Sequence, residues 1–187
     1  MKVLIVVDMQ NDFIDGVLGT KEAQAIVPRV CDKIRNFDGL VIATKDSHGE
    51  DYLETQEGKN LPIPHCIVGT IGHDINRDIL FAIREKHGLM MEKHTFGTFK
   101  LSKWIGKMVD LFSEEKMVDL FSEKIEAIEL IGVCTDICVI NNALILKAAF
   151  PEVPIYVDAT CCAGVTPELH EAALKVMKSC QIIVEDE

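Results

Sequence analysis

Short apolar runs of strand length alternate with amphipathic segments of helical length along the chain, and this alternation constrains the fold more than any other feature. The first run, residues 3–7, is rich in β-branched residues, as expected for a strand that is buried on both faces. Strands that alternate with helices predict a parallel sheet with helices on both sides. The predicted strands are residues 3–7, 39–44, 88–92, 127–133, 154–158 and 181–184.

The predicted helices carry apolar residues three and four positions apart, which gives each helix one apolar side. Thr20 is a candidate cap for the first helix, and Pro28 predicts that this helix starts late or kinks. No linker rich in Pro, Gly or Ser divides the chain, so we expect one α/β domain over residues 1–187. The predicted helices are residues 20–37, 75–86, 101–112, 136–149 and 167–179.

Two segments interrupt the alternation. Residues 45–74 contain two prolines and four glycines, and a loop this long inside a compact domain is usually functional. Residues 107–114 recur as residues 116–123, and a shift of nine residues turns a helix by about two and a half turns. We therefore expect a break near residues 113–116, and we interpret the repeat as a local duplication without a function of its own.

Charge and hydropathy exclude several classes of partner. The formal net charge is −11 and the Lys and Arg residues are scattered, which argues against nucleic acid and anionic membranes. No apolar run approaches the ~20 residues that a membrane span needs, and the first residues lack the cleavage site of a signal peptide. We expect a cytoplasmic protein whose seven cysteines, an odd number, are thiols rather than a disulfide framework.

One of these thiols lies where a nucleophile is expected. Cys138 falls in the first turn of the predicted helix 136–149, with Asp136 as its cap, and a helix N-terminus favours a thiolate. The preceding residues 132–135 predict a sharp turn from strand to helix, whose backbone amides could form an oxyanion hole. The alternative is a buried, inert cysteine at a packed helix start.

A carboxylate and an amine follow two other strands of the predicted sheet. Asp8 follows strand 3–7 and Lys93 follows strand 88–92, so both are expected at the same edge as Cys138. Together they would supply a nucleophile, a proton acceptor and an orienting cation. The alternative is a structural salt bridge between Asp8 and Lys93.

The long loop contains a second candidate site. Asp46 and His48 leave the same side of an extended segment, and a distant His65 adds a second imidazole, with Glu57 as a fourth group. Such a set suits one divalent metal ion, with zinc expected and iron or manganese as alternatives. Solvent-exposed polar residues of the loop are the competing interpretation. A thiolate zinc site is a weak alternative, because its cysteines lack the usual spacing: Cys134, Cys138, Cys161 and Cys162.

Taken together, these motifs resemble those of the isochorismatase-like cysteine hydrolases, and within them the nicotinamidase/pyrazinamidase branch. The matching stretches are Val-Val-Asp-Met-Gln-Asn-Asp-Phe at 6–13, Asp-Ser-His at 46–48, Pro-His-Cys at 64–66 with Gly69, Thr70 and Gly72, Lys93, and Gly-Val-Cys-Thr-Asp-Ile-Cys-Val at 132–139. The resemblance implies a three-layer α/β/α fold with a six-stranded parallel sheet. It also implies a small-molecule amide substrate and a homo-oligomer.

The resemblance assigns a role to each candidate residue. It implies Cys138 as nucleophile, Asp8 as proton acceptor and later donor, and Lys93 as the orienting cation. It implies an oxyanion hole from the backbone N–H groups of Cys134 and Cys138, with a cis peptide before Cys134. The motif of Asp46, His48 and His65 implies the nicotinamidase branch, in which the metal holds the pyridine nitrogen and so positions the amide.

The sequence departs from this branch next to His65. Family members usually have an aromatic residue there, whereas residues 61–64 read Leu-Pro-Ile-Pro. Phe13 and Phe96 are our candidates for the substrate-binding wall, with Phe99 as a further one. Two alternatives to a nicotinamidase therefore stay open, a hydrolase of another small amide or ureido compound and a catalytically silent binding or assembly protein.

Overall fold

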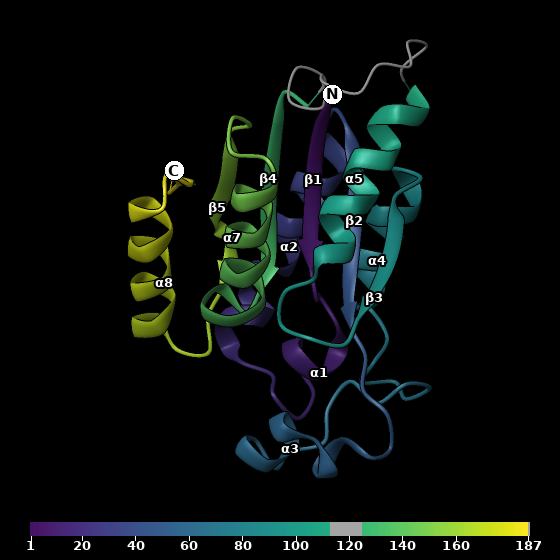
Figure 1. The fold of residues 1–187 in the computed structure, drawn as a ribbon. Coiled ribbons are helices and arrows are strands. Elements are labelled where there is room, and N and C mark those ends of the chain that lie inside the picture. Colours follow the sequence, from purple (N-terminus) through teal and green to yellow (C-terminus); the bar gives the residue numbers. More distant parts are fainter. Residues whose placement is uncertain (113–124, 187) are drawn as a thin grey trace.

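The computed structural model describes residues 1–112 and 125–186 and contains a six-stranded, all-parallel sheet in the order β3-β2-β1-β4-β5-β6 (Figure 1). This confirms the predicted sheet. The strands are β1 Lys2–Val7, β2 Leu40–Asp46, β3 Leu89–Lys93, β4 Ala127–Val133, β5 Ile155–Ala163 and β6 Ile183–Glu185.

Helices cover both faces of the sheet, which makes the fold a three-layer α/β/α sandwich (Figure 1). The helices α2 and α4 pack on one face, whereas α5, α7 and α8 pack on the other. The helical elements are α1 Asn11–Ile14, α2 Lys21–Asn36, η1 Tyr52–Glu54, α3 Gln56–Asn60, α4 Arg77–Glu85, α5 Phe99–Phe112, η2 Thr135–Val139, α7 Ile140–Ala149 and α8 Pro167–Ser179. No helix in the described ranges is long and apolar enough to cross a membrane.

The central strand β1 shows why the sheet needs both helical layers. Val3, Ile5 and Val7 belong to the core beneath α5, α7 and α8, whereas Leu4 and Val6 belong to the core beneath α2 and α4. All five side chains are at most 1% exposed. The alternation follows from the two-residue period of a strand, so a continuous apolar run fills both cores at once.

Helix α2 begins where its cap predicts. The Thr20 side chain accepts a hydrogen bond from the Ala23 backbone N–H at 3.0 Å, and the helix starts at Lys21. The helix is continuous across Pro28, so the predicted late start is wrong. Burial of its apolar face offsets the hydrogen bond that a proline cannot donate.

Several strands extend beyond their predicted ends. Strand β2 continues to Asp46 and β3 continues to Lys93, and these two residues pair in register as the last of their strands. Strand β5 continues to Ala163, past a register shift in its pairing with β4. Backbone pairing with neighbouring strands, which a single sequence does not display, sets these ends.

The loop between β2 and α4 contains two short helices, η1 and α3, that the apolar periodicity did not predict. They are too short to show a helical period, and α3 depends on its cap, in which Thr55 accepts a hydrogen bond from Gly58 N–H at 3.0 Å. The predicted break near residues 113–116 and the second copy of the repeat lie outside the described residues.

Candidate active site

The ends of the four parallel strands β1, β2, β3 and β4 bring an amine, two carboxylates and a thiol together. Lys93 Nζ lies 2.7 Å from Asp8 Oδ2, 3.1 Å from Asp46 Oδ1 and 3.5 Å from Cys138 Sγ. All four side chains are at most 5% exposed. The Asp8 carboxylate and the Cys138 thiol thus share one partner, the Lys93 amine.

Asp8 is held in an unusual backbone conformation at the end of β1. Its φ of 48° lies in the left-handed region, which costs a non-glycine residue about 1 kcal/mol. The Thr44 hydroxyl donates to Asp8 Oδ1 at 2.7 Å and accepts from the Asp8 N–H at 3.3 Å. These two bonds fix the carboxylate beside Lys93.

Gly132 lets the end of β4 approach β1 closely. Its φ is 117°, and a Cβ at this position would lie 2.2 Å from the Val7 carbonyl oxygen. The next peptide bond, between Val133 and Cys134, is cis. Only glycine fits this position, and the close approach brings the turn at Cys134 beside Asp8.

Cys138 lies in a π-helical turn rather than in the first turn of an α-helix. The turn η2 precedes α7, and the Cys134 carbonyl accepts hydrogen bonds from Ile137 N–H and Val139 N–H, each at 3.1 Å. The prediction of Asp136 as the cap is wrong, because Asp136 Oδ1 accepts from the Val165 N–H at 2.9 Å. Asp136 thus ties the turn to the segment after β5.

Electrostatics at the site oppose a resting thiolate. Burial raises the pKa of Cys138 well above its ordinary value, the Asp8 carboxylate raises it further, and Lys93 lowers it only in part. Burial also raises the pKa of Asp8, against the opposing effect of Lys93. Burial and the Asp8 carboxylate therefore both oppose the thiolate that was expected at the helix terminus.

Lys93 keeps its charge in this buried site. Burial opposes the ammonium form, but Asp8, Cys138 and Asp46 together hold the pKa of Lys93 above its ordinary value. The pKa of Asp46 is lowered despite its burial, because His48 and Lys93 both stabilise its carboxylate. The amine is therefore a fixed positive charge between two acids.

Asp46 also belongs to a cluster that can hold a metal ion. Asp46 Oδ2 lies 2.7 Å from His48 Nε2 and 3.8 Å from His65 Nε2, and Glu57 Oε1 lies 3.8 Å from each of these nitrogens. The four ligand atoms lie within 4.8 Å of one another. His65 Nδ1 donates to the Ile63 carbonyl at 2.9 Å, which leaves Nε2 unprotonated in the neutral ring. This donor set fits a divalent transition metal.

Two residues of the first motif support the metal-binding segment, and the sequence analysis did not single them out. The Gln10 side chain donates to the Asp46 carbonyl at 2.8 Å and accepts from the Asp46 N–H at 2.7 Å. Asp12 Oδ2 accepts from the Cys66 N–H at 2.7 Å, next to His65, and a Cβ at Gly72 would collide with it at 2.1 Å. The sequence feature that could have identified Gln10 and Asp12 is that both belong to the motif at residues 6–13, which also contains Asp8.

A cavity of about 730 Å³ connects the thiol and the metal-binding cluster. Both Phe13 and Phe96 line it, and the Phe13 ring meets the His65 ring edge-on at a centroid distance of 5.4 Å. Phe99 is 71% exposed and is not part of the lining. The rest of the wall combines polar residues, among them Thr20, Gln56 and Asn60, with the aliphatic residues Leu18, Ala23, Leu61, Val133, Ile137, Ala163 and Val165. His94 and Thr95, which the sequence analysis missed, also line this cavity.

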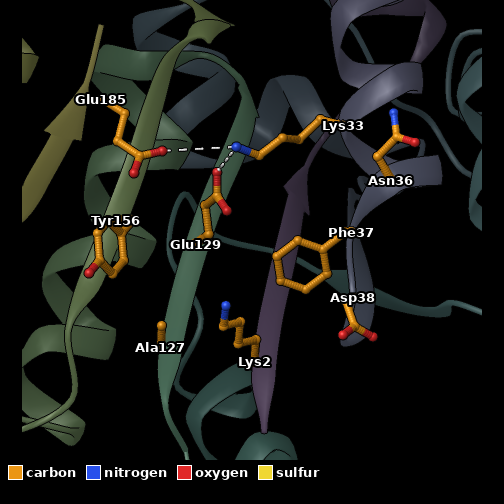
Figure 2. Close-up of a pocket in the computed structure, with 9 residues that line it drawn as sticks. All are labelled: Lys2, Lys33, Asn36, Phe37, Asp38, Ala127, Glu129, Tyr156 and Glu185. Atoms are coloured by element: carbon orange, nitrogen blue, oxygen red, sulfur yellow. Dashed lines mark ion pairs between the residues drawn. The ribbon is translucent and has the colours of Figure 1, made fainter. Parts of the chain in front are cut away.

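A second group of acids lies at a separate cavity, which opens near the amino ends of β1, β4 and β5. Figure 2 shows Lys33 reaching from α2 toward Glu129 and Glu185, with ion pairs to both. Lys33 Nζ also lies 3.0 Å from Asp158 Oδ2. Because the amine already lies among the three carboxylates, this group ties α2 to the sheet rather than forming a metal site.

The chain is similar to known proteins over nearly its whole length. The isochorismatase domain matches residues 2–186. An uncharacterized isochorismatase family protein of Bacillus subtilis, PncA, is 33% identical over 150 residues, which is 76% of each chain. A nicotinamidase/pyrazinamidase of Mycobacterium tuberculosis is 28% identical over 188 residues and 97% of each chain. The crystal structure of the pyrazinamidase of Pyrococcus horikoshii in complex with zinc is 26% identical with a TM-score of 0.73, over 100% of this chain and 99% of that chain.

Proposed function

Because this chain belongs to the isochorismatase family, we propose that it is a metal-dependent cysteine amidohydrolase that converts nicotinamide and water to nicotinate and ammonia. The observation that carries the proposal is the contact of Lys93 Nζ with both Asp8 and Cys138, together with the cavity that Cys138 shares with Asp46, Glu57 and His65 of the metal-binding cluster. The relatives and structures named above support the choice of a carboxamide as substrate.

In the first half of the reaction, Cys138 Sγ attacks the carboxamide carbon while Asp8 accepts the thiol proton. The backbone N–H groups of Cys134 and Cys138 stabilise the oxyanion of the tetrahedral intermediate. The C–N bond then breaks, Asp8 returns the proton to the leaving amine, and ammonia departs from a thioester.

In the second half, a water molecule attacks the thioester carbonyl carbon while Asp8 accepts one of its protons. The C–S bond breaks and Asp8 returns its proton to the Cys138 sulfur. The acid product passes its remaining proton to solvent and leaves as nicotinate. Lys93 stays protonated throughout, since its role is to hold Asp8 in place and to stabilise the negative charge that develops on the sulfur.

Asp46, His48, His65 and Glu57 would hold the metal ion, and zinc is the ion we propose. When bound, the ion supplies a Lewis acid that holds a pyridine nitrogen and orients the carboxamide toward the thiol. We expect His48→Ala to weaken zinc binding on the order of 100-fold or more, because a direct ligand is lost. Glu57→Gln should weaken it by about tenfold, since Glu57 is the most peripheral member.

Zinc binding is measured by calorimetry and by elemental analysis after dialysis. The matched control is His87→Asn, at a histidine in the turn before β3, where Asn tolerates the left-handed φ of 51°. Stoichiometric zinc in the His48→Ala protein would show that the ligand assignment is wrong.

The proposed reaction is tested by ammonia release from nicotinamide with zinc-loaded enzyme, beside a panel of other small carboxamides and ureido compounds. We expect nicotinamide to be hydrolysed and the product to be nicotinate by mass. If other amides are hydrolysed but nicotinamide is not, the reaction class is supported and the substrate is a different amide. No hydrolysis of any compound would contradict the proposal.

One observation favours a second candidate, a hydrolase of another small carboxamide. The aromatic residue that usually precedes the metal-binding histidine is replaced by the segment Pro62-Ile63-Pro64, and Leu61 of the same segment contributes an aliphatic side chain to the cavity wall. A pyridine ring would then rely on Phe13 and Phe96 for its aromatic contacts.

The alternative of a catalytically silent binding protein needs a test other than thiol reactivity. Burial raises the pKa of the Cys138 thiol, so slow alkylation of Cys138 is expected of an active enzyme as well.

A further inference from the structure

We propose that His94 and Thr95 form a pair of hydrogen-bond acceptors that selects carboxamides with an additional N–H donor, such as an amino or ureido group. This inference rests on the proposed amidohydrolase reaction and concerns the second candidate above, in which the preferred substrate is a small carboxamide other than nicotinamide. Both residues follow Lys93 directly in the chain and line the cavity that contains Cys138.

The hydrogen bonding of His94 fixes which ring nitrogen can accept. His94 Nδ1 lies 2.7 Å from the carbonyl oxygen of Ser47. A carbonyl oxygen only accepts, so Nδ1 must donate, and Nε2 of the neutral ring is then an acceptor. Among the residues that the structure describes, none is hydrogen-bonded to this Nε2.

Thr95 offers an acceptor for a similar reason. Its hydroxyl donates to the Gly97 carbonyl at 2.7 Å, so the only proton of this group is already used. While this bond is made, Thr95 Oγ1 can accept a hydrogen bond from a ligand but cannot donate one. Two adjacent residues that line one cavity thus each carry an acceptor.

Selectivity comes from the cost of covering these acceptors. His94 and Thr95 are exposed, and the cavity that they line has aliphatic residues such as Leu18 and Ile137 as well as the polar residues Gln56 and Asn60. A substrate that covers His94 and Thr95 with an apolar atom takes both acceptors out of water and leaves them unpaired, whereas a substrate with an N–H donor satisfies them. Ser47 also lies between Asp46 and His48, so the bond from His94 anchors the ring to the metal-binding segment.

Binding to the zinc-loaded Cys138→Ala protein tests the inference without turnover. The ligands are the ring-amino isomers of nicotinamide, with nicotinamide as the matched ligand that lacks the donor. We expect at least one isomer to bind about tenfold more tightly than nicotinamide. Adding His94→Leu should remove this preference, and His94→Gln, whose amide oxygen can accept, should retain part of it.

His87→Asn in the same Cys138→Ala background is the control and should keep the full preference. The inference is overturned if no isomer binds more tightly than nicotinamide, or if His94→Leu leaves the preference intact. Ammonia release by the wild-type enzyme, which retains Cys138, separates the two proposals. If carboxamides are hydrolysed with no preference for an N–H donor, only the role of His94 and Thr95 is overturned. If no carboxamide is hydrolysed, the proposed reaction itself is overturned.

Discussion

Replacing Cys138 with alanine is expected to reduce ammonia release from nicotinamide by at least about 10⁴-fold, because the variant has no atom that can form the thioester. The neighbouring Asp8 and Lys93 would remain paired at 2.7 Å, so no buried charge loses its partner. The fold should therefore persist, with a loss of about 1 kcal/mol from the small cavity that the missing sulfur leaves.

Steady-state ammonia release and thermal unfolding measure the two effects. Mass spectrometry after rapid quenching should detect an acyl adduct on the wild-type chain and none on Cys138→Ala. Cys180→Ala is the matched control, because Cys180 is exposed at the end of α8 and outside the catalytic cavity. Undiminished ammonia release by Cys138→Ala would rule out the covalent mechanism.

Replacing Lys93 with methionine should impair both activity and stability. Removing the ammonium leaves Asp8 and Asp46 buried as like charges without their common partner. Loss of one partner from a buried ion pair costs about 3–5 kcal/mol, so the free energy of unfolding should fall by that amount at neutral pH. We expect kcat/KM to fall by about 10³-fold or more, since Asp8 loses its position and the sulfur its stabilising charge.

The stability loss from Lys93→Met should depend on pH in a defined direction. In the wild type the pKa of Asp46 is lowered, so its pairing stabilises the fold at neutral pH, and that stabilisation is lost as the pH falls through the folded pKa. The difference in unfolding free energy between variant and wild type should therefore shrink toward acid pH, as both carboxyls become neutral. Denaturant unfolding between neutral and acid pH measures this difference, with the exposed Lys100→Met as control. A difference that grows toward acid pH would contradict the assigned charges.

Some elements could be predicted to the residue. The predicted strand 127–133 and helix 167–179 coincide with β4 and α8, because β4 is a strongly apolar run and α8 has a Thr166 cap followed by proline at its first position. The ends of β2 and β3 were missed because the polar residues Asp46 and Lys93 have no apolar pattern. Only cross-strand pairing keeps these residues in the sheet.

The layered α/β fold and the residue types of the site could be read from the chain alone, because apolar periodicity and the order of polar residues after each strand are local properties. The contacts among these residues, and the directions in which their pKa values shift, required the folded structure. It joined the thiol and the metal-binding cluster through Lys93 and replaced the expected α-helical turn at Cys138 by a π-helical one. It also set the pKa of Cys138 above its ordinary value. These outcomes depend on burial and on distances between residues far apart in sequence, and neither quantity is encoded in local spacing.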